Sequence, residues 1–341
     1  MNAGINQSLP LIDGHIHLPG REMCDKLLAD LKYTGTRKFA IQNIGRSRHD
    51  PDGKGFRQAL EMKQQMPEEV FVFGGLDFSD CTDAGYKPRV PLVEQVQKLR
   101  DMGCDGLKLL TGKPDFRKFV GHPLDGPLFE PMLKSAEETQ FPLLWHVGDP
   151  PEFWSEHTVP PWARTRGWWY DSTVPKKKQI DEEIDRVFRR HPKLNVTLPH
   201  FFFLSDRLDD AAALLDAYPN YALDLAPGVE MYHNFTANHA KARAFFIKYA
   251  GRILYGSDFG MGCGWGQDRG MMIRRFLETD DRFDVPEDPA MTPDERPKLH
   301  GLSLPADAVR KICVENFVRR VGAKPRPLAG DVDTLMKRWL A

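Results

Sequence analysis

The chain has 341 residues, of which 41% are apolar and 28% charged, a composition ordinary for a globular protein and unlike that of a disordered one. Its 47 basic and 48 acidic residues give a formal net charge of −1. That balance leaves no electrostatic footprint for nucleic acid or an acidic membrane surface, so neither is expected as a partner. The five scattered cysteines argue against a disulfide framework and a zinc-cysteine site.

The amino-terminal residues MNAGINQSLPLIDGHIHL lack the basic region and apolar core of a signal peptide. No apolar run approaches the roughly 18 residues that a membrane span requires. We therefore expect a protein that does not enter the membrane and that resides in the cytoplasm.

Short apolar runs rich in β-branched and aromatic residues recur along the chain and predict eight strands. Their apolar character is continuous rather than alternating, as in strands that are buried on both faces. In chain order they are Leu11–Leu18, Lys38–Ile44, Val70–Phe78, Gly106–Leu110, Pro142–Gly148, Asn195–Phe203, Tyr221–Ala226 and Ile253–Phe259.

Amphipathic segments with apolar residues at i, i+3 and i+4 alternate with these strands and predict helices. They are Met23–Leu31, Phe56–Met66, Leu92–Met102, Leu128–Thr139, Ile180–Arg190, Leu208–Tyr218, Lys241–Tyr249 and Pro305–Val318, followed by an extra carboxyl-terminal helix at Val332–Leu340. Eight strand–helix units without a glycine-rich phosphate loop after the first strand favour a closed (β/α)8 TIM barrel over a doubly wound sheet. Since such barrels reach about 250 residues or more as one domain, we expect a single domain over residues 1–341.

Two connections are long, at about 149–179 and 260–303, and each follows the carboxyl end of a predicted strand. The first is rich in proline and aromatic residues, and the second contains GMGCGWGQDRG. Long loops in compact domains are usually functional, and this end of a barrel carries the active site. We therefore expect both segments to border the functional site.

The strongest local signal is Asp13-Gly14-His15-Ile16-His17 at the end of the first predicted strand. Residues i and i+2 of a strand point to the same side, so both imidazoles can reach one ion, and imidazole is a good ligand for divalent metals. Because an H-x-H triplet is common by chance, this pattern alone is weak. It gains weight from three residues further along the chain.

His146, His200 and Asp258 fall at the carboxyl ends of the fifth, sixth and eighth predicted strands, where barrel enzymes keep their catalytic groups. A lone histidine in an apolar run is more often a hydrogen-bonded core residue, and Asp258 alone could be a helix N-cap. Four such elements converging on one end of a barrel are better explained by a metal site.

These motifs resemble those of the amidohydrolase superfamily, in the amidohydrolase-related branch that also contains the aminocarboxymuconate-semialdehyde decarboxylase-like enzymes. The resemblance spans nearly the whole chain. The carrying segments are IDGHIH at Ile12–His17, WHVG at Trp145–Gly148, LPH at Leu198–His200, YGSD at Tyr255–Asp258, SDRLDDAAALLDAYPNYALDLA after His200 and VENFVRRVG at Val314–Gly322. The set is specific for the fold and for metal use, but not for a substrate.

The resemblance implies that His15, His17 and His146 ligate one divalent metal ion, with zinc the first choice, and that Asp258 is the fourth ligand. A water would complete the site, and Asp258 would carry its proton to a leaving group. His200 would hold or polarise that water or a substrate oxygen. LPHFFF departs from the glycine-containing stretch common in the family, and its bulk is expected to narrow the pocket.

Lys108, on the fourth predicted strand, has three interpretations. It is a carboxylated bridge to a second metal ion, as in two-metal members of the superfamily, or an ammonium that binds a substrate carboxylate. The third interpretation is a structural lysine with its head at the barrel mouth.

The aromatic segment around Trp168 is either a lid that excludes water or a surface flap or subunit contact, which leaves a homodimer open. Arg46, Arg164 and Arg166 lie in loops at the same end. Each is a candidate for binding a substrate anion, although a surface role is the commoner one for a single arginine.

Three functions are compatible with a chain that acts on or binds small molecules. The first is a metal-dependent hydrolase of an amide, lactone or related carbonyl, and the second is a nonoxidative decarboxylase of a small unsaturated or aromatic acid on the same ligands. The third, a metal-binding protein without activity, fits less well, because a structural zinc site is closed by four ligands and needs no open position. The residues favour hydrolysis, while a carboxylate held by Lys108 or the loop arginines would favour decarboxylation.

Overall fold

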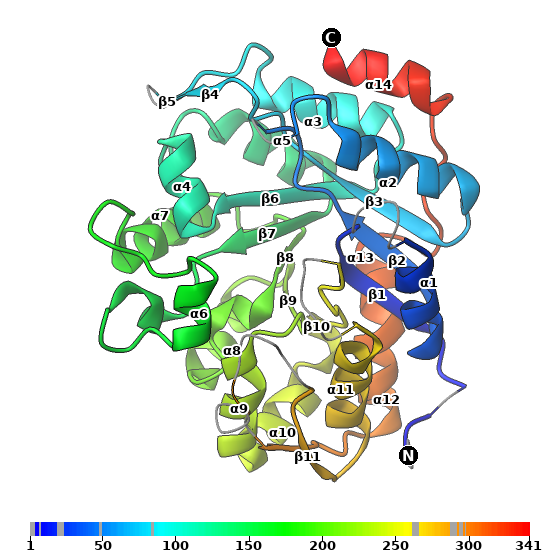
Figure 1. The fold of residues 1–341 in the computed structure, drawn as a ribbon, viewed down its shortest axis with the longest axis vertical. Helices are drawn as coiled ribbons and strands as arrows, with labels where there is room; N and C mark the ends of the chain where they lie inside the picture. The colour runs from blue at the N-terminus through cyan, green and yellow to red at the C-terminus, as the bar shows by residue number, and fades with distance from the viewer. Residues whose placement is uncertain are drawn as a thin grey trace.

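Eight parallel strands form the central sheet, in the order β1-β2-β3-β6-β7-β8-β9-β10 (Figure 1). They are β1 (Leu11–Ile16), β2 (Thr36–Gln42), β3 (Val70–Gly75), β6 (Gly106–Gly112), β7 (Leu143–Val147), β8 (Val196–Leu198), β9 (Tyr221–Asp224) and β10 (Ile253–Leu254). The computed structural model describes residues 4–341 except 7, 19–23, 48–49, 83–84, 261–265, 287–291, 293–295 and 297. Every predicted strand is present, and the predicted barrel is confirmed.

The first strand meets the segment after the last strand, which closes the ring. The amide of Gly14 donates to the carbonyl of Tyr255 at 3.0 Å, and the amide of His17 donates to that of Phe259 at 2.7 Å. The amide of Asp258 donates in turn to the carbonyl of His15 at 2.7 Å. These bonds fix Asp258 beside the H-x-H triplet, although the two are more than 240 positions apart in the sequence.

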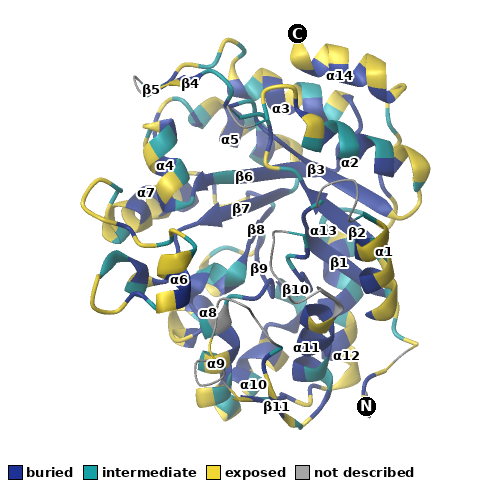
Figure 2. Ribbon diagram, in the orientation of Figure 1, coloured by how far each residue is buried: buried dark blue, intermediate teal, exposed yellow. Residues whose placement is uncertain are grey.

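Helices surround the strands, which Figure 2 shows as almost wholly buried. They are α1 (Cys24–Tyr33), α2 (Lys54–Gln65), α3 (Leu92–Asp101), α4 (Pro114–Val120), α5 (Glu130–Thr139), α6 (Pro161–Thr165), α7 (Lys177–Arg190), α8 (Leu208–Ala217), α9 (Val229–Ala237), α10 (His239–Lys248), α11 (Gly266–Glu278), α12 (Ala306–Arg310), α13 (Asn316–Arg320) and α14 (Val332–Leu340). All nine predicted helices are confirmed, although Met23 lies outside the described residues. The helix predicted at Pro305–Val318 consists of α12, a π-helical turn η6 (Lys311–Glu315) and α13.

The segment predicted as a loop at 260–303 instead contains a helix, α11, and a short hairpin of β11 (Arg282–Asp284) and β12 (Lys298–His300). The glycines at its start concealed the helix. A Cβ at Gly270 would lie 2.7 Å from Thr34 Cγ2 and 2.9 Å from the Tyr255 hydroxyl, so this glycine permits close packing of the helix and does not mark a turn. A second hairpin, β4 (Cys81–Thr82) and β5 (Gly85–Tyr86), follows β3.

The interior of the barrel is filled with apolar side chains in its amino-terminal half. Ile12, Phe71 and Leu254 form a cluster there with Phe317 of α13, whose ring lies edge-on to that of Phe71 at 4.9 Å between centroids. This plug occupies the amino-terminal half, and the large cavity of the barrel lies at the carboxyl ends of the strands. Within the described part of the chain, no helix is long and apolar enough to cross a membrane.

Candidate active site

A cavity of about 380 Å³ lies at the carboxyl ends of the strands. Its lining includes the candidate residues of β1, β6, β7, the turn after β8 and the segment after β10, which are His15, His17, Lys108, His146, His200 and Asp258. The loop at 149–179 adds an aromatic wall that includes Phe153, Trp162 and Trp168. Residues from six parts of the sequence thus share one pocket, at the end of the barrel where they were predicted.

His15, His17 and Asp258 form a cluster of metal-ligand residue types in this pocket, and their ligand atoms lie within 4.8 Å of one another. The Nε2 atoms of His15 and His17 lie 3.6 and 3.5 Å from Oδ1 of Asp258. The β1 backbone aims both imidazoles at the cavity, and the bond between the Asp258 amide and His15 brings the carboxylate to them. Two imidazoles and a carboxylate at this spacing match the ligand types of a divalent metal site.

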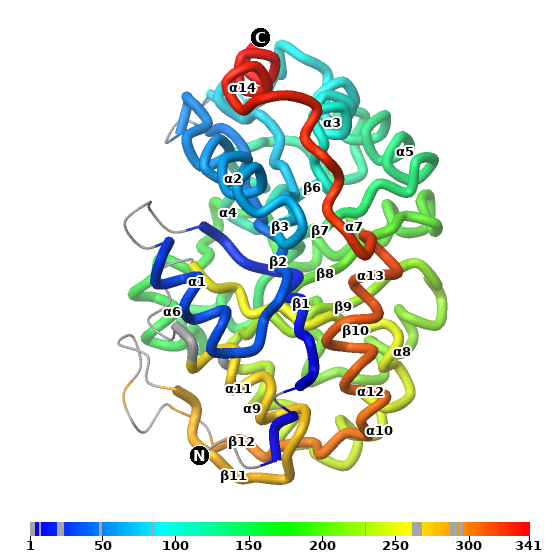
Figure 3. The backbone as a smooth tube through the Cα atoms, turned by 90° about the vertical axis from the view of Figure 1, so that its right-hand side faces the viewer, coloured from blue at the N-terminus to red at the C-terminus, as the bar shows by residue number. Residues whose placement is uncertain are grey.

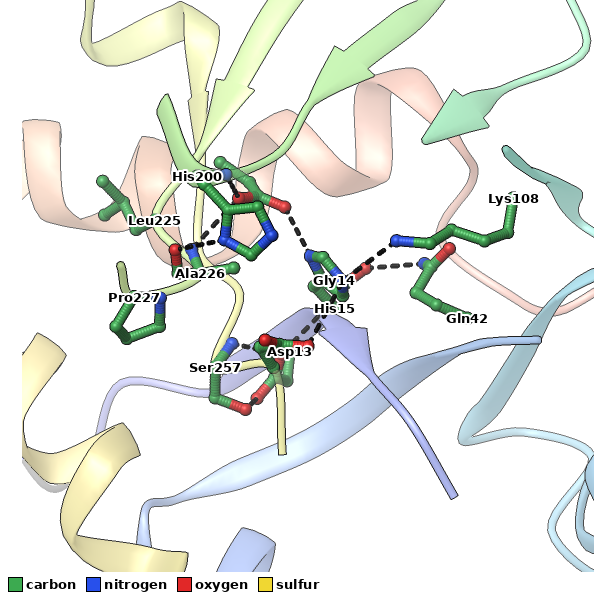
Figure 4. Close-up of polar contacts among 12 residues, drawn as sticks. Asp13, Gly14, His15, Gln42, Lys108, His200, Leu225, Ala226, Pro227 and Ser257 are labelled. Atoms are coloured by element: carbon green, nitrogen blue, oxygen red, sulfur yellow. Dashed lines mark hydrogen bonds and ion pairs between the residues drawn. The ribbon is translucent and has the colours of Figure 1, made fainter. Parts of the chain in front are cut away.

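Asp224, at the end of β9, orients His15 in this cluster. The sequence analysis did not identify Asp224 as a site residue. Nδ1 of His15 donates to Oδ2 of Asp224 at 2.8 Å, and Oδ1 accepts the amides of His200 at 2.9 Å and Ala226 at 3.0 Å (Figure 4). The donated proton fixes the tautomer of His15 with a lone pair on Nε2, the atom nearest Asp258. Metal-binding histidines commonly have such a carboxylate partner. The position of Asp224 at the end of a predicted strand was the signal available.

Asp13 begins the motif that the sequence analysis singled out, but it was given no role there. Its carboxylate accepts the Ser257 hydroxyl at 2.5 Å and the amides of Ser257 and His15, both at 3.1 Å. Burial raises the pKa of Asp13 to about 7, and these three donors oppose that rise. Asp13 therefore joins β1 to the segment that carries Asp258.

His200 does not lie in a strand as predicted, because β8 ends at Leu198 and residues His200–Phe203 form a single turn, η3. All four residues have φ near +54°, a left-handed turn that L-residues rarely adopt (φ 54, 53, 54 and 53°). Phe201 anchors the turn in the core, and Phe203 stacks on the His200 ring at 5.6 Å. Of the three phenylalanines only Phe203 lines the pocket, which narrows it less than the sequence suggested.

The tautomer of His200 is fixed by its partner. Nδ1 lies 3.0 Å from the carbonyl oxygen of Ala226, which only accepts, so Nδ1 carries the proton and Nε2 carries the lone pair. Burial, with a smaller contribution from His146, lowers the pKa of His200 to about 4. A neutral His200 can thus accept a hydrogen bond through Nε2 but cannot donate one from that atom.

Lys108 lies against the cluster, with Nζ 3.2 Å from Nε2 of His15. Burial lowers its pKa to about 8, while the carboxylates of Asp258 and Asp224 act in the opposite direction. Burial would also raise the pKa of Asp258, but His15, Arg269 and His17 outweigh burial and hold it below its ordinary value. Arg269 Nη2 is 3.8 Å from Asp258 Oδ2. The carboxylate is therefore kept ionised, with the Arg269 cation beside it.

His146 lies in the pocket but apart from the tight cluster. Its ring centroid is 5.0 Å from that of His200, and its Nε2 lies 3.1 Å from the carbonyl oxygen of Gly148 and 3.4 Å from Oδ1 of Asp149. Nε2 therefore carries the proton, which leaves the lone pair on Nδ1. The role of His146 as a third imidazole ligand stays a prediction.

The aromatic segment at 149–179 packs on itself and borders the pocket. Tyr170 donates a hydrogen bond to Asp149, and Nζ of Lys113 lies 2.7 Å from the Tyr170 hydroxyl and 3.2 Å from Oδ2 of Asp149. Arg166 lies over the rings of Trp162 at 5.6 Å and Trp168 at 5.3 Å. Arg166, Lys113 and Trp168 line the cavity, so this segment and its neighbour supply both cations and apolar walls.

Two of the candidate arginines do not line this cavity. Arg164 is bonded to the carbonyl of Glu156 at 2.9 Å and lies over the ring of Trp169 at 4.9 Å. Arg46 Nη1 pairs with Oδ2 of Asp77 at 2.5 Å. A substrate-binding role for either residue has no support from its position.

A second cluster of metal-ligand types lies outside the pocket, at His239, Asp280 and His300. The two imidazoles stack with centroids 3.9 Å apart, and His300 Nε2 lies 3.0 Å from Oδ1 of Asp280. The Asp280 side chain is 75% exposed, so this cluster lies at the surface. Because it contains the same residue types, substitutions in this surface cluster can serve as controls for substitutions in the buried cluster.

Comparisons with known proteins agree with this geometry. The family model described as Amidohydrolase matches residues 12–319. An uncharacterized TIM-barrel protein from Bordetella bronchiseptica is 15% identical with a TM-score of 0.58, and the match covers 92% of this chain and 98% of that protein. A probable 2-pyrone-4,6-dicarboxylic acid hydrolase from Acinetobacter baumannii is 10% identical with a TM-score of 0.53, and the match covers 91% of this chain and 98% of that protein. The 5-carboxyvanillate decarboxylase from Sphingomonas paucimobilis is 12% identical with a TM-score of 0.52, and the match covers 92% of this chain and 99% of that protein. No curated protein matches the sequence.

Proposed function

We propose that this chain, which belongs to the amidohydrolase family, is a metal-dependent hydrolase of a small amide, lactone or related carbonyl compound. The observation that carries the proposal is the convergence of His15, His17 and Asp258 in the pocket, with ligand atoms within 4.8 Å of one another. Similar folds include a hydrolase and a decarboxylase, so only the residues themselves can distinguish the two reactions.

The residues present fit one divalent ion, with zinc the first choice. His15, His17 and Asp258 would hold it, and His146 would join them through Nδ1. The proton that His15 Nδ1 donates to Asp224 leaves Nε2 free to coordinate, as a bound metal requires. A divalent ion bound there supplies a Lewis acid and brings the pKa of its water to about 7.

Asp258 is the residue that we assign to proton transfer. Its carboxylate is ionised and lies 3.6 and 3.5 Å from the two imidazoles, so it can take a proton from an attacking water and deliver it to a leaving group. His200 presents an unprotonated Nε2 to the same pocket. It can orient the water by accepting a hydrogen bond, which supports hydrolysis, whereas polarising a substrate carbonyl would need an N–H at that atom.

Decarboxylation is the second candidate, and one observation favours it. Lys108, Lys113 and Arg166 all line the cavity, and their charges suit a substrate carboxylate. This reaction also needs a group that delivers a proton to carbon, and Lys108 beside His15 is the candidate for that task. The same Lys108, if carboxylated, would instead bridge a second ion and favour hydrolysis.

Metal content tests the central claim. We expect about one equivalent of zinc by elemental mass spectrometry in the wild type, and its loss in His15→Ala/His17→Ala. The matched control, His239→Ala/His300→Ala, removes two histidines from the surface cluster and should keep the metal. About two equivalents would support a carboxylated Lys108. Loss of metal in the control alone, or no metal in any protein after zinc is supplied, would overturn the proposal.

The loaded enzyme then distinguishes the two reactions. Panels of lactones and amides are followed by acid release, and panels of aromatic and unsaturated acids by release of carbon dioxide. Turnover in the first panel that disappears in Asp258→Asn supports the hydrolase. Turnover in the second panel only would replace it by the decarboxylase.

A further inference from the structure

The opposite end of the barrel has a second cavity, of about 460 Å³, below the amino ends of β8, β9 and β10. Three arginines line it, Arg252, Arg319 and Arg320, together with the amides Gln140, Asn195 and Asn220. A proline and a glycine complete the lining, and no lining residue is acidic. Figure 3 shows this side, with α13, which carries Arg319 and Arg320, towards the viewer.

Neutral acceptors hold these guanidinium groups in place. Nε of Arg252 donates to the Tyr221 carbonyl at 2.5 Å, and Nη2 of Arg320 donates to the carbonyls of Val196 and Asn220, both at 2.8 Å. Nη2 of Arg319 donates to the side chain of Asn316 at 2.9 Å. Satisfying these acceptors is a structural role, and it uses only part of each fork of donors.

Each guanidinium keeps N–H donors beyond those bonds, and the charge of Asp216 offsets that of Arg252 only in part, without a close ion pair. Among the described residues, no carboxylate lies within 4.0 Å of the guanidinium nitrogens of Arg252, Arg319 or Arg320. Nε of Arg320 is buried without a hydrogen-bond partner. Burial and the charges of Arg252 and Arg319 together lower the pKa of Arg320 to about 9, so the three cations repel one another.

Two buried arginines elsewhere in this chain are paired with carboxylates. Arg117 makes two hydrogen bonds of 2.8 Å to the carboxylate of Glu183, and Nε of Arg274 donates to Glu278 at 2.7 Å. Arg252, Arg319 and Arg320 are less buried than these two, and they differ in lying together beside one cavity with no carboxylate within 4.0 Å among the described residues. An anion bound in that cavity would offset the repulsion among the three positive charges and accept hydrogen bonds from their remaining N–H donors.

We propose that this cavity, the amino-end arginine site, binds a small oxyanion of the phosphate type. Guanidinium groups recognise phosphate and carboxylate oxygens through paired, charge-assisted hydrogen bonds. Three converging positive charges favour a doubly charged phosphate group over a single carboxylate. The anion is either free phosphate or the phosphate of a small organic molecule. The Nδ2 atoms of Asn195 and Asn220 already donate within the protein, but their side-chain oxygens can accept hydrogen bonds from the rest of such a molecule.

The site is distinct from the metal cluster, since Phe317, Phe71 and Ile12 fill the barrel between the two cavities. Bound anion would tie α13 to the starts of β9 and β10 through Arg320 and Arg252. Its binding is therefore expected to stabilise the fold and to need no metal in the other cavity.

Calorimetric titration of the full chain with inorganic phosphate at constant ionic strength tests the proposal. We expect saturable binding with about one site, weakened about tenfold or more in Arg319→Gln, which removes one charged donor pair from an exposed position. The matched control Arg189→Gln removes the same charge from α7, where the side chain is 72% exposed, and should bind like the wild type. Arg320→Lys keeps the charge but loses the planar fork, and should also weaken binding.

Parallel titrations separate the possible sources and sites. Glycerol 3-phosphate that binds more tightly than phosphate would assign the site to a phosphorylated small molecule, and equal affinity would assign it to the free ion; acetate should bind much more weakly than either. Three results would overturn the proposal: no saturable binding of phosphate, equal affinity in Arg319→Gln and Arg189→Gln, or loss of binding in Lys113→Gln, which would place the anion in the active-site cavity.

Discussion

The two ends of this barrel are built from the same eight strands but carry opposite chemistry. At the carboxyl ends, imidazoles and carboxylates from β1, β9 and the segment after β10 converge on a cavity. At the amino ends, the interior is closed by Phe317 and Leu254, and the arginines there bind backbone carbonyls. The candidate metal-binding residues therefore lie at the end of the barrel that apolar side chains do not fill.

The difference in charge follows the same division. At the carboxyl end, cations and carboxylates lie close together around the metal cluster, as Arg269 and Asp258 do at 3.8 Å. At the amino end, Arg252, Arg319 and Arg320 have no carboxylate within 4.0 Å among the described residues. The mixed charges at the carboxyl end thus suit proton transfer, and the positive charges at the amino end suit the binding of an anion. Variants at each end should accordingly separate activity from stability.

The largest expected effect is on turnover, in Asp258→Asn. Loss of a positioned proton acceptor typically costs about 10²- to 10⁴-fold in rate, and we expect a fall of that size in kcat on the substrate that the panels identify. The amide oxygen still offers a ligand, so metal content measured in parallel should stay near the wild-type value. Asp280→Asn, in the surface cluster, is the control and should leave turnover unchanged. Metal loss that accounts for the whole defect would show that Asp258 is a ligand only.

The amino end should respond in stability instead. Lys63 of α2 pairs with Asp105, just before β6, and both side chains are 1% exposed. Lys63→Met leaves a buried carboxylate without its cation, and we expect a loss of about 3–5 kcal/mol in the free energy of unfolding, measured with urea. Zinc content should be unchanged in the folded fraction.

Lys26→Met is the control for that experiment. Lys26 pairs with Asp30 from a side chain that is 58% exposed, and its replacement should alter stability by no more than about 0.5 kcal/mol. If Lys63→Met lowered metal affinity as much as it lowered stability, the two ends of the barrel would not be separable.

A smaller effect is expected from Asp224→Asn, which tests the orienting residue at the carboxyl end. Without the carboxylate, the proton on Nδ1 of His15 is no longer fixed, and metal affinity should fall about 10- to 100-fold. Competition with a chelator at pH 8 measures this loss, because burial raises the pKa of Asp224 only to about 6 and the group is ionised there. Affinity equal to that of Asp216→Asn, at a side chain 61% exposed, would remove Asp224 from the site.

Asp224 also shows how far sequence reasoning reaches. His15, His17 and Asp258 could be placed together because strand ends meet at one end of a barrel and the triplet marks the first of them. Asp224 and Asp13 satisfy the same rule, yet nothing local distinguishes an orienting carboxylate from a surface one. Their roles depend on distances across the barrel, such as the 2.8 Å between His15 and Asp224.

Two other features could not be predicted from the sequence, one because of its unusual backbone conformation and the other because its residues are far apart in the chain. The left-handed turn at His200–Phe203 contradicts the preferences of its own residues, since histidine and phenylalanine normally avoid positive φ. The tertiary contacts of Phe201 and the bond from the His200 amide to Asp224 outweigh that local preference. At the amino end, Arg319 and Arg320 are neighbours in the sequence, but only the fold brings Arg252 beside them.

The smallest expected effect concerns the pH dependence of stability at Glu230, which lines the active-site cavity. Burial, together with the charges of Glu152 and Asp149, raises its pKa from 4.5 to about 7. Gly228 makes this position possible, because a Cβ there would lie 2.4 Å from Oε1 of Glu230. Between pH 4.5 and 7 the folded state therefore holds a proton that the unfolded state has lost.

Glu230 thus contributes stability below pH 4.5 that is lost as the pH rises through 7. Glu230→Gln cannot titrate, so its stability relative to the wild type should increase over this window and stay constant above it, by roughly 2 kcal/mol between pH 5 and pH 8. Urea unfolding at pH 5 and pH 8 measures the difference, with Glu138→Gln, at a side chain 64% exposed, as the control. Parallel profiles for Glu230→Gln and the wild type would mean that water reaches Glu230 in the pocket and keeps it ionised. The carboxyl end would then be more open than its aromatic wall suggests, and the contrast with the plugged amino end would be sharper still.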